Sequence, residues 1–343
     1  MTTELVGLDI GGSHTRGVLF RDGTPEREAR SGSANVQNVP AEQASACLVS
    51  VLSELGASPA TPVVAGSGGV DTAHDAARLA GLIRSAGSLD PGTPVTAVHD
   101  TRLILAAGGH TTGIALIAGT GSVAWGVDAS GREVRAGGWG YLLGDEGSGY
   151  WIGREAVRRV LRLSQQAGTA ERTAPEGPGR SARSGGFVEA GGSSRAEGPT
   201  TVAAAGGPDR AASSAGCEGE ALTRAVLEHA GVAEPADLIG AFHERPDRTH
   251  WAGLARSVCE LAASGDATAA ELVAVAAGHL AELVLTVAHA MDEPLPVVVG
   301  GGLTGSEVGD RVAQLLRQHG LSVTLLDREP VLGAPLLARS DPT

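Results

Sequence analysis

The sequence contains no lysine, only three cysteines and only nine aromatic side chains among its 343 residues. Cys47, Cys217 and Cys259 lie far apart and show no CxxC or CxxH spacing, which argues against a zinc cage and a disulfide framework. The formal net charge is −13, so the chain lacks the dense cationic surface that nucleic acid or an anionic membrane requires. We therefore expect no nucleic-acid partner, and reduced thiols that fit the cytoplasm.

The first ten residues, MTTELVGLDI, lack the basic region and the long apolar stretch of a signal peptide. No uninterrupted apolar run reaches the roughly 18 residues that span a bilayer. These absences predict a cytoplasmic protein with no membrane partner. A chain of 343 residues also exceeds the usual size of one compact core, so two domains are expected.

Two stretches of the chain share one pattern, in which a buried strand, a glycine turn and a second strand follow one another. The predicted strands are 5–10 and 16–20 in the first stretch, and 113–118 and 122–127 in the second. A dinucleotide-binding unit would place a helix after its glycine turn, so the second strand argues against that fold. The repeat predicts two related α/β domains that face one ligand.

The middle of the chain changes composition abruptly. Residues 168–216 are rich in Gly, Ser, Ala, Pro, Arg and Glu and nearly devoid of large apolar side chains, which predicts a disordered insertion. We expect a helix before it, from Trp151 to about Gln166, and several helices after it, including 251–263. A buried strand at 296–299 precedes the last glycine cluster.

Four glycine turns follow predicted strands: Gly11-Gly12-Ser13, Gly66-Ser67-Gly68-Gly69, Gly119-Thr120-Gly121-Ser122 and Gly300-Gly301-Gly302. Such turns present consecutive backbone N–H groups to an anion, and Ser or Thr hydroxyls add donors for phosphate oxygens. A single glycine turn needs no ligand, but four in one chain favour a polyphosphate site. The Walker lysine motif is missing, which excludes a P-loop in its usual form.

Two aspartates stand at the ends of predicted strands. Asp9 precedes the first turn and could hold Mg²⁺ beside a phosphate chain, or it could bond the N–H groups of its own turn. Asp100 ends the predicted strand 96–100, ahead of the predicted helix 101–107, at an edge where α/β sheets place ligands. It is a candidate general base for attack on phosphorus and, equally, a candidate helix N-cap.

The segment 137–153, GGWGYLLGDEGSGYWIG, gathers seven glycines, Asp145, Glu146 and four of the nine aromatics. Carboxylates beside flat aromatic surfaces suit a polyhydroxylated small molecule. The alternative interpretation is a tight turn, capped by acidic residues, before a helix that starts near Ser148.

These motifs resemble the N-acetylglucosamine kinase group of the BadF/BadG/BcrA/BcrD ATPase family, within the acetate and sugar kinase, heat-shock protein and actin superfamily. In chain order the matching motifs are LDIGGSHTRGVLF, VHD at 98–100, LIAGTGSVAWG at 116–126, GGWGYLLGDEGSGYWIGREA at 137–156 and VVVGGGL at 297–303. The resemblance implies an α/β, two-lobed ribonuclease H-like (actin-like ATPase) fold with duplicated domains and an interdomain cleft. The lobes would be residues 1–110 and 111–343.

The resemblance also implies an activity, the ATP- and Mg²⁺-dependent phosphorylation of an amino sugar, foremost N-acetylglucosamine at its 6-hydroxyl. Asp100 would take the proton of that hydroxyl, and Asp9 would organise Mg²⁺. ATP would be contacted by Gly11, Gly12, Ser13, Thr120, Gly121, Gly301, Gly302 and Ser306. The sugar would be contacted by Asn35, Asp100, Gly138, Trp139, Gly140 and Asp145.

Several alternatives stay open. Glucosamine and N-acetylmuramic acid are alternative substrates, because Val123 stands where animal relatives carry an asparagine that contacts the sugar. Two other functions are an ATP-driven activator of a reductase, which needs closely placed cysteines, and a non-catalytic sugar sensor, which would not need Asp100. Without lysine, cationic help to the γ-phosphate would come from Mg²⁺, backbone N–H groups or an arginine such as Arg16. Dimers are frequent among relatives, so a homodimer is also open.

Overall fold

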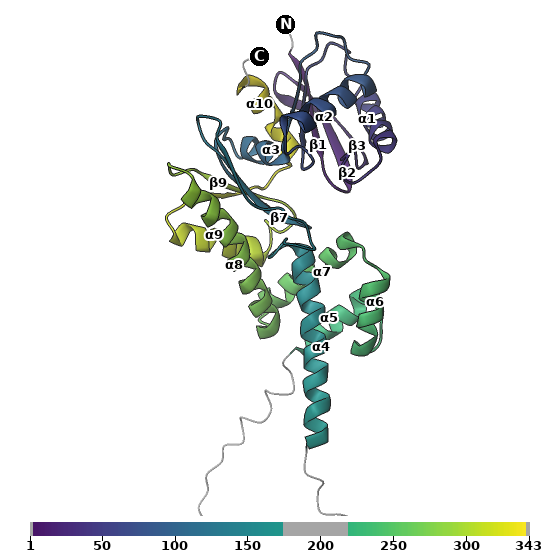
Figure 1. Ribbon diagram of the computed structural model, residues 1–343, viewed down its shortest axis with the longest axis vertical. Helices are drawn as coiled ribbons and strands as arrows, with labels where there is room; N and C mark the ends of the chain where they lie inside the picture. Colours follow the sequence, from purple (N-terminus) through teal and green to yellow (C-terminus); the bar gives the residue numbers. More distant parts are fainter. Residues whose placement is uncertain (1–2, 174–218, 341–343) are drawn as a thin grey trace, which may run out of the picture.

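The computed structural model describes residues 3–173 and 219–340, and within these ranges the chain forms two five-stranded sheets flanked by helices (Figure 1). The first sheet has the strand order β3-β2-β1-β4-β5. Its strands are β1 (Glu4–Ile10), β2 (His14–Arg21), β3 (Thr24–Gly32), β4 (Val63–Ser67) and β5 (Val95–Val98). The helices of this half are α1 (Ala41–Leu55), α2 (Ala73–Ala86) and α3 (Asp100–Ala107).

The second sheet has the order β10-β9-β6-β7-β8. Its strands are β6 (Gly113–Ala118), β7 (Ser122–Val127), β8 (Glu133–Gly137), β9 (Val297–Gly300) and β10 (Val323–Leu325). Its helices are α4 (Gly149–Thr173), α5 (Glu220–Ala230), α6 (Leu238–Glu244), α7 (Arg248–Ala263), α8 (Ala267–Ala290) and α9 (Glu307–Gln318), with a 3₁₀ turn at Pro235–Asp237.

The two sheets repeat one topology. In each, the first three strands form an antiparallel meander, a fourth strand pairs in parallel with the first, and a fifth pairs in parallel with the fourth. A glycine turn joins the first strand of each meander to the second, at 11–13 and at 119–121. This duplication confirms the predicted two-lobed α/β fold.

The strands β1 and β6 lie at the centre of their sheets and are buried almost throughout. Helices pack on both faces of these strands, so an apolar run without strict alternation is what a central strand requires. The hairpin between β2 and β3 closes through Asp22 and Gly23, both in the left-handed region at φ 52° and 79°. Two-residue loops of this kind match the twist of the flanking strands.

Helix α4 is longer than the sequence predicted. It runs to Thr173, so residues 168–173 continue the helix and the expectation of disorder was wrong for them. The helical turns before residue 168 are rich in strong helix formers, among them Arg and Gln, which favour continuation of the helix. The remainder of the predicted insertion, 174–216, lies outside the described residues.

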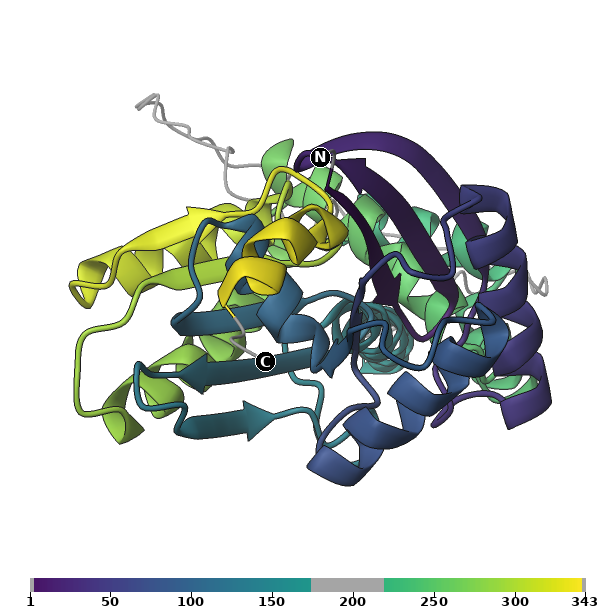
Figure 2. The ribbon, with the colours of Figure 1, turned by 90° about the horizontal axis from the view of Figure 1, so that it is seen from above.

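The end of the chain returns to the first lobe. A 3₁₀ turn at Pro330–Gly333 leads into α10 (Ala334–Ser340), whose apolar side chains share a core cluster with β1, β2 and α3. Figures 1 and 2 show α10, in yellow, beside α3 and the purple strands. The boundaries that the resemblance implied, 1–110 and 111–343, therefore need one correction, because 330–340 pack on the first sheet. We keep the rest of that division as a proposal.

Helix α8 is apolar along most of its length. Among the described residues it is the one helix long and apolar enough, by length and composition, to cross a membrane, with a hydropathy of 1.7 in its most apolar window. Its buried side chains, including Val273, Leu280 and Val284, belong to the main core cluster of the second lobe. Packing against the second sheet and α9 thus accounts for its composition.

Candidate functional site

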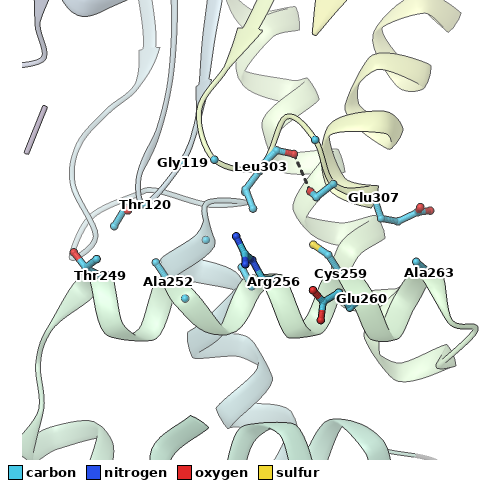
Figure 3. Close-up of a pocket in the computed structure, with 16 residues that line it drawn as sticks. Gly119, Thr120, Thr249, Ala252, Arg256, Cys259, Glu260, Ala263, Leu303 and Glu307 are labelled. Carbon is cyan, nitrogen blue, oxygen red and sulfur yellow. Dashed lines mark hydrogen bonds between the residues drawn. The ribbon is translucent and has the colours of Figure 1, made fainter. Parts of the chain in front are cut away.

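A cavity of about 830 Å³ lies in the second lobe, where the glycine turns after β6 and β9 meet helices α4, α7 and α9. Its walls carry Gly119 and Thr120 on one side and Gly302 and Ser306 on the other. The face of α7 closes it, and Figure 3 shows Arg256 and Cys259 pointing from α7 toward the turn of Leu303. The volume falls in the range of pockets that hold a nucleotide-sized ligand.

The two glycine turns approach each other as backbones. Gly301 has φ 107°, and a Cβ on it would lie 2.5 Å from the carbonyl oxygen of Ala118 at the end of β6. Only glycine accepts both that φ and that contact. Leu303 N donates to the same Ala118 oxygen at 2.9 Å, which fixes the second turn on the first. Gly119, Gly301 and Gly302 therefore come together at one end of the second sheet.

The start of α4 anchors the Gly119–Thr120 turn. Gly149 N donates to Gly119 O at 2.8 Å, and Tyr150 N points at Thr120 O at 3.4 Å. Ser148 Oγ accepts from Trp151 N at 3.2 Å and so caps the helix. The motif GDEGSGYW thus starts a helix near Ser148 and seats one wall of the cavity as well.

Asp145 lies against the same turn rather than in open solvent. It is buried, and its backbone is left-handed at φ 62°. Its Oδ1 accepts from Ser122 N at 3.1 Å, while its buried Oδ2 has no hydrogen-bond partner and lies 3.7 Å from Arg248 Nη2. Burial raises the pKa of Asp145 above its ordinary value. An unpaired oxygen at this position can accept a hydrogen bond from a ligand hydroxyl.

The first lobe carries two further carboxylates, those of Asp9 and Asp100. Burial raises the pKa of Asp100 to about 7, and the nearby charge of Asp9 adds to the shift. Burial likewise raises the pKa of Asp9 to about 6. The sequence placed Asp100 at a strand end, but β5 ends at Val98 and the N-cap of α3 is His99, whose ring accepts from Thr101 N at 3.3 Å. Asp100 is the first helical residue, so the interpretation of it as an N-cap is wrong.

The turn after β4 brings Asn35 toward Asp100. A Cβ on Gly69 would lie 2.5 Å from Asn35 Oδ1, and a Cβ on Gly68 would lie 3.1 Å from Asp100 Oδ2. Asn35 is buried and accepts from Gln37 N at 3.0 Å through Oδ1, which fixes its orientation. This glycine turn therefore leaves a surface without side chains between an amide and a carboxylate.

Strand β8 ends at the buried Gly137 and passes into a half-buried loop at 138–140. Gly137, Gly138 and Gly140 have φ between 70° and 77°, and the side chain of Trp139 is 67% exposed. Gly138 N donates to Ser122 O at 3.0 Å, which ties the loop to β7 beside Asp145. Three of the residues predicted to contact a sugar thus lie together on the second lobe.

The turn Gly11-Gly12-Ser13 stays on the first lobe and does not line the cavity. Ser13 is exposed, and its hydroxyl bonds the ring of His14 at 3.0 Å. Arg16, a candidate source of positive charge, is held by Glu28 at 2.8 Å and by Glu329. Its side chain is 13% exposed, and the two carboxylates already neutralise the positive charge that a phosphate would need.

The sheet topology, the cavity and the carboxylates fit one family. The family model of the BadF/BadG/BcrA/BcrD ATPase family matches residues 6–338. The chain belongs to that family. Membership of this ATPase family implies the use of ATP.

Two relatives of this BadF/BadG/BcrA/BcrD family member carry the names of sugar kinases. It is 33% identical over 181 residues to an N-acetylmuramic acid/N-acetylglucosamine kinase of Clostridium acetobutylicum, an alignment that covers 50% of this chain and 58% of that protein. The chain thus spans little more than half of that curated relative. A crystal structure of a candidate N-acetylglucosamine kinase from Chromobacterium violaceum aligns over 98% of both chains, with 26% identity and a TM-score of 0.62.

A more distant structure shares the fold alone. The ROK family glucokinase of Streptomyces griseus, solved with glucose and AMPPNP, aligns over 99% of this chain and 100% of its own, with 16% identity and a TM-score of 0.52. The agreement over the full lengths confirms the actin-like, two-lobed architecture of this BadF/BadG/BcrA/BcrD family member.

Sequence reasoning missed the α7 wall of the cavity. Thr249, Arg256, Cys259 and Glu260 line it, and none of them belongs to a glycine motif. Arg256 is the one cationic side chain on the described walls. The helical spacing of α7 could have shown a common face, but only the packing of α7 beneath two distant glycine turns makes that face part of a site.

Proposed function

We propose that this chain transfers the γ-phosphoryl group of ATP to the 6-hydroxyl of an amino sugar, foremost N-acetylglucosamine. The observation that carries the proposal is the pairing of a nucleotide-sized cavity under two glycine turns with Asp100 on the facing lobe, a half-buried carboxylate whose Oδ1 has no hydrogen-bond partner. The kinase relatives supply the class of acceptor.

The nucleotide half of the site belongs mostly to the second lobe. Gly302 and Ser306 line the cavity and, with the neighbouring Gly301, flank the nucleoside. Thr120 also lines it and, with the neighbouring Gly121, binds phosphate oxygens through N–H and hydroxyl groups. Arg256 adds a cation on the α7 side. Gly11, Gly12 and Ser13 would complete the phosphate contacts from the first lobe once the lobes close on the substrates.

The sugar half lies at the lobe boundary. Asn35 from the first lobe and Gly138, Trp139, Gly140 and Asp145 from the second hold the sugar. Asp100 then accepts the proton of the 6-hydroxyl as that oxygen bonds to the γ-phosphorus, and ADP departs with the electrons of the broken P–O bond. Asp145 serves as a hydroxyl acceptor, because phosphoryl transfer needs positioning and charge neutralisation more than a second base.

Asp9 is proposed to hold Mg²⁺. Within residues 3–173 and 219–340, no three His, Cys, Asp or Glu side chains lie close enough to form a metal site of their own. Mg²⁺ in kinases commonly uses one or two carboxylates, with waters and phosphates as the other ligands. Asp9 fits that donor set, because the mutual repulsion of Asp9 and Asp100 leaves negative charge there for a cation to neutralise. A bound cation would offset the charge of the triphosphate.

The reductase-activator alternative is disfavoured by the described cysteines. Cys47 lies on α1 of the first lobe and Cys259 lies in the nucleotide cavity, so the two cannot share a cluster. Cys217 lies outside the described residues. The sugar-sensor alternative differs from the kinase in one respect that can be measured, namely ADP formation.

A coupled ADP-release assay with N-acetylglucosamine, glucosamine, N-acetylmuramic acid and glucose tests the proposal. We expect sugar-dependent turnover that is highest with N-acetylglucosamine, and a product whose phosphorus couples to the C6 protons in NMR. Fast ADP release without any sugar would contradict the kinase, and sugar binding without ADP formation would favour the sensor. Higher turnover of glucosamine would assign Val123 to the sugar preference.

The pH dependence of turnover should report Asp100. A general base acts only when ionised, and burial together with Asp9 raises the pKa of Asp100 to about 7. We therefore expect kcat/KM for the sugar to fall about tenfold per pH unit below the pKa of Asp100, which is about 7 before Mg²⁺ binds and which a cation at Asp9 would lower, and to level off above it. The measurement is kcat/KM from about pH 5.5 to about 9 at saturating Mg²⁺ and excess coupling enzyme. A flat profile across this range would rule out a base with this pKa.

A further inference from the structure

Arg135 links the two lobes beside the proposed sugar site. It lies on β8 of the second lobe, and its Nη1 contacts Asp71 Oδ1 of the first lobe at 2.9 Å. Its Nε donates to Gly137 O at 3.1 Å, and its Nη2 donates to Gly138 O. The guanidinium also covers the ring of Trp125, with its Cζ 5.6 Å from the ring centroid. The Arg135 guanidinium therefore binds three oxygen acceptors with its nitrogens and, at the same time, stacks its flat face on Trp125.

The carbonyls that Arg135 binds belong to a loop that needs an external support. Gly137 and Gly138 are consecutive left-handed residues, a conformation that glycine adopts and leaves easily. Beyond Gly138 the exposed Trp139 makes no ring contact among the described residues. Arg135 and the bond from Gly138 N to Ser122 O thus set the direction in which the loop presents Trp139.

The first-lobe end of the contact leads to Asp100. Asp71 Oδ1 lies 4.0 Å from His99 Nε2, and the His99 ring stacks on Trp125 with centroids 4.1 Å apart. His99 Nδ1 lies 3.1 Å from Asp100 Oδ1. Burial lowers the pKa of His99 to about 4, so the ring is neutral at pH 7 and Arg135 is the cation that faces Asp71. Asp71, His99 and Trp125 therefore lie between Arg135 and Asp100 as neighbours in space, although His99 Nδ1, which accepts from Thr101 N, makes no hydrogen bond to Asp100.

We propose that Arg135 is a positioning residue, which holds the Gly137 and Gly138 carbonyls and fixes the sugar loop relative to the helix that carries Asp100. The proposal rests on the proposed function, because the loop and Asp100 have their roles only there. Arg135 does not line the nucleotide cavity. Its loss should therefore disturb the sugar and the transfer step, and leave ATP binding alone.

The test compares Arg135→Ala, Arg135→Lys and Asp71→Asn with the matched control Glu133→Ala. Glu133 lies two residues away on β8 and pairs with Arg102 of α3 at 3.4 Å, so its removal breaks a neighbouring ion pair without touching the loop. For Arg135→Ala we expect KM for the sugar to rise about tenfold and kcat to fall about tenfold, with KM for ATP within about twofold. Lysine keeps the charge but not the fork, so it should recover part of the loss.

The controls separate positioning from damage to the fold. Glu133→Ala should leave both KM values within about twofold of the parent protein. An Arg135→Ala protein with unchanged sugar kinetics would overturn the proposal, and so would an equal rise of both KM values. If the Arg135→Lys variant had the sugar kinetics of the parent protein, only the positive charge at this position would matter and the positioning role would be disproved.

A readout without turnover keeps this proposal distinct from the kinase assignment. If the parent protein releases no ADP with any sugar, the proposed function fails, and thermal unfolding of Arg135→Ala, Asp71→Asn and the double variant still tests the contact. We expect the double variant to lose clearly less melting temperature than the two single losses combined. Additive losses would show that Arg135 and Asp71 do not act through each other.

Discussion

Asp100→Asn is expected to lower kcat about 10³-fold while KM for the sugar and for ATP stays within about threefold. Asparagine matches aspartate in shape and cannot accept the proton of the attacking hydroxyl. Oδ1 of Asp100 has no hydrogen-bond partner in the structure, so the exchange removes no hydrogen bond at that atom. Loss of rate without loss of binding is the signature of a group that acts in the transition state.

The same coupled ADP-release assay measures this effect, and calorimetric titration with the sugar checks that binding survives. Asp90→Asn is the matched control, since Asp90 is exposed on the loop before β5 and should tolerate the amide at full activity. A variant of Asp100 that retained more than about a tenth of parental kcat would exclude it as the base.

Gly153→Ala is expected to lower the free energy of unfolding by about 3 kcal/mol and to raise KM for ATP about tenfold. Helix α4 packs on α7 at this residue, and a Cβ there would lie 2.0 Å from the carbonyl oxygen of Trp251. The obstacle is backbone, so it cannot swing aside as a side chain would. The helices must separate, and both of them border the nucleotide cavity, as Gly149 and Ala252 show.

Chemical denaturation followed by circular dichroism and an ATP titration measure the two effects. Gly278→Ala offers the control, because Gly278 lies inside α8 with open space around the position of a new Cβ. The same exchange there should stabilise the fold by about 0.5–1 kcal/mol, since alanine favours the helix. If Gly153→Ala unfolded like the parent protein, the close α4–α7 contact would be disproved.

Local patterns explain what the sequence could predict. The two strand–turn–strand repeats predicted the duplicated sheets, because the hydrophobic pattern of a strand and a glycine turn can both be recognised from residues that are neighbours in the sequence. The glycine turns after β6 and β9 lie at the same edge of the second sheet, since these two strands are parallel and end at one edge. The strand before Asp100 was predicted two residues too long, because β5 ends at Val98, and the N-cap of α3 was placed one residue late, because it is His99.

What the sequence could not predict depends on contacts between distant residues. Asp71 and Arg135 are 64 positions apart and belong to different lobes. The residues around each of them contain no pattern from which the ion pair could be predicted. The face of α7 became a cavity wall only through its packing beneath two turns. Arg16 looked like an exposed strand charge, but Glu329, near the end of the described chain, binds it.

The return of residues 330–340 to the first lobe makes the folding of that lobe depend on a distant part of the chain. Val331, Ala334 and Leu337 complete a core cluster with Leu5 and Phe20. Part of the apolar interior of the first lobe therefore stays uncovered until the residues after 330 have docked. The first lobe cannot finish folding before the second lobe, which lies between its two segments in the sequence, has been synthesised.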